Sequence, residues 1–180
     1  MRKVIILLSL LLSLIGFGQN SAVSGVAFEI GKENIYKANL NEGVFLKDLS
    51  WAWSSQNACF TEIQKTKFTG KHVFFTGIIP AHSITSIEVI PLDKKANFSI
   101  YGYQINLNED FLVPNLPHCI ACEADFKWDY KKKNSHQNHI RKIGDFTAID
   151  SSYRLVIGVT AANGLDKGDF YIKIKTKAYR

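Results

Sequence analysis

Three cysteines carry most of the reactive chemistry that this sequence offers. Cys59 stands alone, whereas Cys119 and Cys122 form a Cys-x-x-Cys pair that follows two prolines. In an exported protein such cysteines are usually oxidised to disulfides. We therefore expect Cys59 to pair with Cys119 or Cys122, which would close a loop of about 60 residues and stabilise the fold by a few kcal/mol. The alternative bridge, between Cys119 and Cys122, closes a very short loop and stabilises less.

The same sulfur atoms support two other interpretations, a thiol redox centre and a zinc site. A redox Cys-x-x-Cys pair usually begins a helix, whose dipole lowers the pKa of a thiol, but this pair lies in a proline-bearing loop. Zinc takes four sulfur or nitrogen ligands in a tetrahedral arrangement. The two histidines that follow the pair are spaced one residue closer than in the usual zinc finger. The candidate zinc ligands are Cys59, Cys119, Cys122, His118, His136 and His139.

The tryptophans offer binding rather than catalysis. An exposed tryptophan on a β-sandwich can stack its flat side chain on a sugar ring, although closing the end of a sandwich is its more common use. The chain contains no nucleophile elbow, no His-Glu-x-x-His motif and no phosphate-binding glycine loop. We therefore assign no catalytic residue and expect a non-catalytic protein without a cofactor. The candidate ligand-binding residues are Trp51, Trp53 and Trp128.

The first nineteen residues have the layout of a secretory signal peptide. Arg2 and Lys3 precede an apolar run from Val4 to Ile15, and small residues follow. This run is too short for a membrane-spanning helix, and no later segment of the chain reaches that length. We expect residues 1–19 to be removed on export, so that the mature bacterial protein is periplasmic or secreted and has no transmembrane segment.

Basic residues give the chain a formal net charge of +6, which falls to +4 without Arg2 and Lys3. They gather in a run from Lys127 to Lys133 and in the alternating lysines near the C-terminus. A solvated surface is the simplest interpretation of this charge. The alternative is a patch for acidic polysaccharide, lipid headgroups or nucleic acid. We expect the partner to be a polysaccharide or another envelope protein, and we do not expect the protein to bind nucleic acid.

Alternating apolar residues predict the strands that must position these side chains. Turn residues separate the runs, and few helical periods occur between them, so we expect one all-β domain: an antiparallel, jelly-roll-like sandwich with a long polar insert. Residues 46–180 form this domain, and residues 20–45 form an arm or extra strands. Plausible core residues are Phe74, Ile87, Val89, Tyr101, Val156 and Phe170. The predicted strands are His72–Ile79, Ile84–Ile90, Asn97–Leu107, Tyr153–Thr160 and Phe170–Thr176, with weaker candidates at Ala124–Tyr130 and Ile140–Ile149.

Four of these stretches give the chain a resemblance to a known family. They are Phe68–Phe75, Ile87–Pro91, Asn97–Tyr103 and Gly168–Ile174. Together they resemble the bacterial pre-peptidase C-terminal type of domain over about residues 57–177. The resemblance implies a jelly-roll-like sandwich with an accessory role in binding or secretion, and it brings no catalytic residues. The insert Pro114–His139, which carries the Cys-x-x-Cys pair, departs from the family pattern.

The sequence therefore predicts an exported, non-catalytic β-sandwich that acts as a binding or accessory module of the bacterial envelope or exterior. A thiol redox or zinc-site protein built on Cys59, Cys119 and Cys122 is the alternative.

Overall fold

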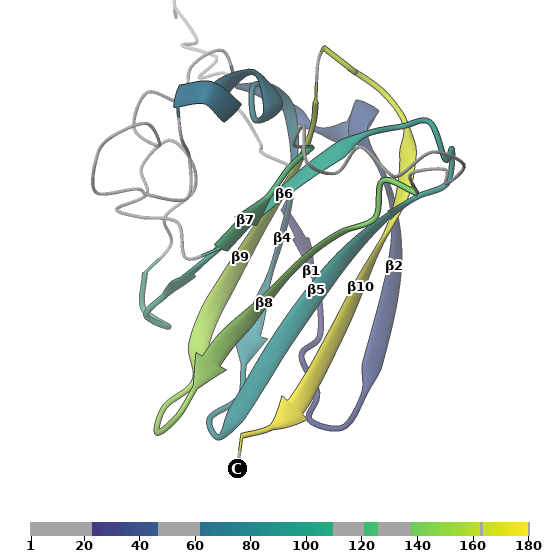
Figure 1. The fold of residues 1–180 in the computed structure, drawn as a ribbon. Coiled ribbons are helices and arrows are strands. Elements are labelled where there is room, and N and C mark those ends of the chain that lie inside the picture. Colours follow the sequence, from purple (N-terminus) through teal and green to yellow (C-terminus); the bar gives the residue numbers. More distant parts are fainter. Residues whose placement is uncertain (1–22, 47–61, 110–120, 126–137, 163, 180) are drawn as a thin grey trace, which may run out of the picture.

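The computed structural model describes residues 23–46, 62–109, 121–125, 138–162 and 164–179. These residues form two β-sheets that lie face to face as the layers of a sandwich (Figure 1). The only helical segments among them are two short 3-10 helices, and none has the length and hydropathy needed to cross a membrane. The predicted all-β sandwich is therefore confirmed.

Sheet A has six strands in the order β1–β4–β9–β6–β7, with β3 also beside β4, and sheet B has four in the order β2–β10–β5–β8. The strands of sheet A are β1 (Val23–Gly25), β3 (Val44–Leu46), β4 (Gly70–Ile79), β6 (Phe98–Ile105), β7 (Ala121–Glu123) and β9 (Tyr153–Ala161). Those of sheet B are β2 (Glu33–Asn39), β5 (Ser83–Pro91), β8 (Arg141–Ala148) and β10 (Asp169–Ala178). The 3-10 helices are η1 (Leu40–Glu42) and η3 (Glu62–Lys67).

The pairing of these strands is that of a jelly roll. From its ends inwards, the chain pairs β2 with β10, β4 with β9, β5 with β8 and β6 with β7, all antiparallel. The chain is thus one long hairpin whose two arms wind around each other, so that β4, β5 and β6 alternate between the sheets, as do β8, β9 and β10. β1 and β3 both pair with β4, whose other neighbour is β9. Strands from residues 23–46 therefore contribute to both sheets.

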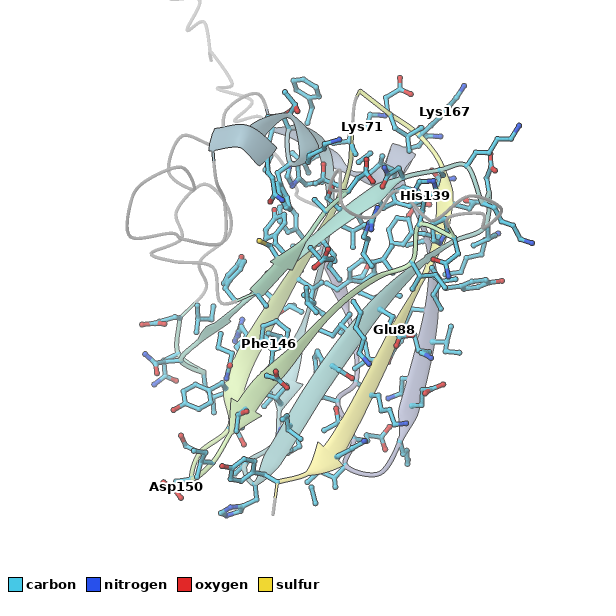
Figure 2. All side chains as sticks on the ribbon, viewed as in Figure 1. Lys71, Glu88, His139, Phe146, Asp150 and Lys167 are labelled. Atoms are coloured by element: carbon cyan, nitrogen blue, oxygen red, sulfur yellow. The ribbon has the colours of Figure 1, made fainter. Side chains whose placement is uncertain are left out.

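The main hydrophobic core lies between the two sheets. β5 and β10 alternate between buried and more exposed residues, as the sequence pattern requires of strands with one face in a core. Phe146 on β8 is fully buried between the layers (Figure 2). Its ring occupies space left by Gly102 on β6, because a Cβ atom on Gly102 would lie 2.6 Å from the Phe146 Cζ atom.

A second hydrophobic cluster covers the other face of sheet A. Phe74, Tyr101 and Val156 belong to it, together with Phe68 beside η3 and Ala124 beside β7. The predicted core residues are all buried, but these first three pack in this outer cluster rather than between the sheets. β4, β6 and β9 are therefore buried on both faces over much of their length.

Six of the predicted strands correspond to β4, β5, β6, β8, β9 and β10, with ends that differ by at most two residues. The candidate at Ala124–Tyr130 is tested only at Ala124 and Asp125, which lie outside any strand. The strand there is β7, which ends at Glu123, while residues 126–130 lie outside the described part of the chain. The three residues of β7 pair with Ile100, Tyr101 and Gly102 of β6.

Candidate functional site

Most of the residues that the sequence singled out lie outside the described part of the chain. Cys122 and His139 are the two that can be placed. The remaining predicted site residues are Cys59, Cys119, His118, His136, Trp51, Trp53 and Trp128, and their disulfide, zinc and sugar-binding roles remain predictions.

Cys122 lies in the middle of β7, directly opposite Tyr101 on β6, and is half-buried against the outer cluster of sheet A. No other cysteine lies among the described residues, so no pair of sulfur atoms is placed at bonding distance there. The position of Cys122 is suited to a structural bridge, because it would fasten the insert to the face of sheet A.

His139 lies just before β8, at the end of the sandwich opposite Asp150 (Figure 2). Its backbone is left-handed, with φ of 51°. Partial burial and the nearby Arg141 lower the pKa of His139, and Asp125 acts in the opposite direction. Within the described ranges, no three histidine, cysteine or acidic side chains are grouped so that they could hold a metal ion.

A buried ionic network holds β7, β8 and η3 together. The Arg141 Nη2 atom donates to Asp125 Oδ1 at 3.3 Å and to Asn97 Oδ1 at 3.1 Å. Lys67, at the end of η3, lies 3.5 Å from the other oxygen of Asp125. The side chains of Arg141 and Asp125 are both largely buried, so their charges depend on this pairing. The network is a structural clamp that sequence analysis missed, since its members are far apart in the chain.

His72 and Tyr101 form a buried pair on the outer face of sheet A. The His72 Nδ1 atom and the Tyr101 hydroxyl are 2.8 Å apart, and neither residue is exposed. Burial lowers the pKa of His72 from 6.5 to about 3, and a weaker interaction with the Phe68 backbone acts in the opposite direction. The His72 Nε2 atom makes no hydrogen bond of normal geometry. A base with such a low pKa is a poor proton acceptor at neutral pH. The two buried rings also contact each other edge to face, with centroids 5.7 Å apart, so the pair is part of the packing of this face.

A groove of about 420 Å³ lies on the solvent-facing side of sheet B. It forms at a β-bulge, where Gly144 and Asp145 of β8 both stand opposite Ser86 of β5 because the register shifts between Thr85 and Ile87. Asp145 takes a positive φ of 65° there. The small side chains at Ser86 and Gly144 leave the surface hollow. The residues that line the groove are Ile84, Thr85, Ser86, Lys142, Gly144, Asp145, Lys175 and Lys177.

Three lysines and one aspartate make this groove positively charged. Lys175 on β10 stands directly opposite Ser86, and Lys177 follows two residues later on the same exposed face. The bare Gly144 could have suggested the bulge, because an isolated glycine in a strand pattern often marks one. The sequence pattern also revealed the lysines of β10. The sequence pattern could not show that these lysines lie near Gly144, because their proximity depends on the pairing of β5 with both β8 and β10.

Among the described residues, some lysines on this face of sheet B form ion pairs with a carboxylate, and others do not. Glu88 lies between Lys173 and Lys142, at 2.9 Å and 3.6 Å from their Nζ atoms. Partial burial alone would raise the pKa of Glu88, but its hydrogen bonds and attraction to Lys173 and Lys142 outweigh that effect and lower the pKa. Within the described part of the chain, Lys175 and Lys177 have no such carboxylate partner. The groove thus has two exposed cations available to a ligand.

A second hollow, of about 490 Å³, lies where the connection that follows β5 and the connection that precedes β10 meet η1. Several of its polar groups are engaged by the protein, and two lysines, Lys95 and Lys167, also line it. Asn39 donates to Asp169 at 2.6 Å, and Asp93 accepts the backbone N–H of Lys95 at 2.9 Å. These contacts are turn and loop interactions, and this hollow is lined by two lysines where the groove on sheet B is lined by three.

No protein-family model, curated protein or solved structure matches this chain. The functional assignment therefore rests on the fold and on the chemistry of its surfaces.

Proposed function

We propose that the protein is an exported, non-catalytic binding or accessory module of the bacterial envelope or exterior, and that the groove on sheet B is its binding surface. The observation that carries the proposal is the combination of a hollow at the β-bulge with exposed lysines that lack carboxylate partners among the described residues. The volume of the groove lies within the range typical of small-ligand sites. A jelly roll is also the fold implied by the resemblance to pre-peptidase C-terminal domains.

Export and binding are tested together by expressing the full chain in a bacterial host and fractionating the cells. We expect the mature protein to lack residues 1–19 by intact mass, to be absent from the cytoplasm, and to sediment with isolated cell-envelope material. Removal of the signal peptide follows from its basic start and short apolar run. An intact N-terminus in a cytoplasmic protein that does not sediment with the envelope would contradict the proposal.

We also propose that Cys122 forms a structural disulfide with Cys59 or Cys119. Its half-buried place beside Tyr101 would let such a bond anchor the insert that has too few apolar residues to hold itself in place. Peptide mapping without reductant should find a peptide containing Cys122 linked to one of the other two. Three alkylated thiols together with one bound zinc per chain would instead support the zinc-site alternative built on Cys59, Cys119 and Cys122.

A further inference from the structure

We propose that the groove on sheet B binds a linear polysaccharide that carries carboxylate groups. This inference rests on the binding function proposed above and names the chemical class of its ligand.

The first argument is charge. Lys175 and Lys177 are exposed and face the groove, while Lys142 shares the single carboxylate of Glu88 with Lys173. Glu88 and Glu33 together balance the lysines of the row next to the groove. The groove itself carries Lys175 and Lys177 against the single carboxylate of Asp145. An anionic ligand gains the attraction of these lysines without breaking a protein ion pair of Lys175 or Lys177.

The second argument is spacing. Lys175 and Lys177 are two residues apart on one face of β10, and each residue adds about 3.3 Å along a strand. β5 separates β10 from β8, and Lys142 on β8 is level with Lys173 through Glu88. Lys142 therefore stands two inter-strand spacings across the sheet from β10 and two residues along the strand from Lys175. Each of these spacings is about 4.8 Å. One small anion cannot reach all three ammonium groups, whereas a polymer with a carboxylate on successive sugar units can contact them together.

The third argument is the floor of the groove. Ser86 and the bulged pair Gly144 and Asp145 lie between the lysines. The Ser86 hydroxyl can donate or accept, and the Asp145 carboxylate can accept from a sugar hydroxyl. A groove of this kind suits a ligand that bears many hydroxyl groups as well as negative charge.

The same residues argue against two other polyanions. None of the described residues that line the groove is aromatic, whereas single-stranded nucleic acids are usually bound by stacking of their bases on aromatic rings. An anionic membrane is a flat surface that binds protruding cations, whereas this site is a hollow whose lysines surround a serine and an aspartate. The hollow with its acceptor groups favours a polysaccharide chain.

The test uses protein purified after expression of the full chain and compares four forms by affinity electrophoresis in gels that contain polygalacturonate. The Lys175→Gln/Lys177→Gln variant removes two groove charges, and the Lys94→Gln/Lys95→Gln variant removes two exposed charges from the β5–β6 connection as a matched control. The Gly144→Leu variant fills the hollow without changing charge. A Cβ at Gly144 meets only the Ser86 Cβ, at an ordinary distance of 3.5 Å, so this variant should fold.

We expect at least tenfold weaker binding of polygalacturonate by the groove variants and a change of less than twofold in the control. Binding by the wild type should weaken as salt rises, because the attraction is between exposed charges. Equal weakening of the control, or full binding by both groove variants, would overturn the inference. So would stronger binding to vesicles with phosphatidylglycerol than to polygalacturonate.

The failure of this inference can be distinguished from the failure of the proposed function. If the wild type binds hydroxyethylcellulose or isolated envelope material but not polygalacturonate, the ligand class is wrong and the binding module stands. If it binds none of these probes, both are wrong.

Discussion

The side chain of Tyr101 extends across the neighbouring strand β9 at a position where β9 has a glycine. Its ring lies over Gly158 on β9 and reaches His72 on β4, two strands from its own position on β6. A Cβ atom at Gly158 would lie only 2.2 Å from the Tyr101 Cζ atom. The outer cluster of sheet A therefore depends on a glycine because of close packing.

We predict that Gly158→Ala lowers the free energy of unfolding by about 1–3 kcal/mol, because an added methyl group overpacks a fully buried site. Urea unfolding measures the change. Gly25→Ala on β1 is the control, since nothing lies within 4 Å of a Cβ there, and it should be neutral or slightly stabilising. Similar losses for both variants would show that strand glycines, rather than the Tyr101 contact, determine the effect.

His72 should make the fold sensitive to acid. Its pKa is about 3 in the folded protein and 6.5 in an ordinary setting, so the unfolded chain binds more protons between these values. Stability contributed by neutral His72 is complete above about pH 6.5 and is lost as the pH falls towards 3. The slope of this loss is at most about 1.4 kcal/mol per pH unit.

Urea unfolding of the wild type and of His72→Gln at pH 7.5, 6 and 5 tests this sign. We expect the wild-type free energy of unfolding to decrease more steeply with falling pH than that of the variant. Parallel pH profiles for the two proteins would show that His72 does not titrate on unfolding.

At the scale of elements, the alternation of apolar residues predicted where the strands lie better than it predicted which of their faces are buried. β5 and β10 alternate, and their positions followed from the sequence. β4, β6 and β9 were also found, but Phe74, Tyr101 and Val156 could not be assigned to the correct face. Alternation reveals a face only when the opposite face is solvated. The short β1, β3 and β7 carry too few residues for any period to be seen.

The ionic clamp shows the second limit of local reasoning. Asp125, Arg141 and Lys67 come from three segments, and no spacing in the sequence connects them. Only the arrangement of β7, β8 and η3 brings them together. The Cys and His residues that were predicted as disulfide partners or zinc ligands were chosen for their chemistry alone, and most of these candidates lie outside the described residues.

We predict that Asp125→Asn lowers the free energy of unfolding by about 1.5–3 kcal/mol, because it removes the negative charge that the buried Arg141 side chain contacts at 3.3 Å. Glu29→Gln, which disrupts the exposed Glu29–Lys32 pair, is the control and should cost much less. Exposed ion pairs are screened by solvent and usually contribute little to stability. Thermal or urea unfolding compares the two variants. A loss for Asp125→Asn no larger than that of the exposed pair would mean that the network does not clamp these elements.

The whole molecule is organised by pairing between the two ends of the described chain. Asn39 of β2 and Asp169 of β10 are 130 residues apart and joined by a side-chain hydrogen bond of 2.6 Å. The class of the fold and its longer strands could be predicted from alternation and turns. The groove could not, because it needs the order β10–β5–β8, which arises from contacts that are distant in sequence.

Such distant pairing should make folding slow. Proteins dominated by non-local contacts refold in milliseconds to seconds, because loop closure must precede the contacts that stabilise it. We expect the main refolding phase, measured by stopped-flow fluorescence on protein with its disulfide state unchanged, to take at least about 10 ms. A main phase completed in microseconds would be inconsistent with cooperative formation of the jelly roll.

The most direct test of the proposed binding surface is an NMR titration that locates the ligand. Isotope-labelled protein from the full chain would be titrated with polygalacturonate oligosaccharides while backbone amide shifts are followed. The largest changes should occur around Ser86, Gly144 and Lys175, because these residues meet at the groove. Changes concentrated instead around Asp93 and Lys167, or on sheet A, would contradict the assignment of the groove on sheet B as the binding surface.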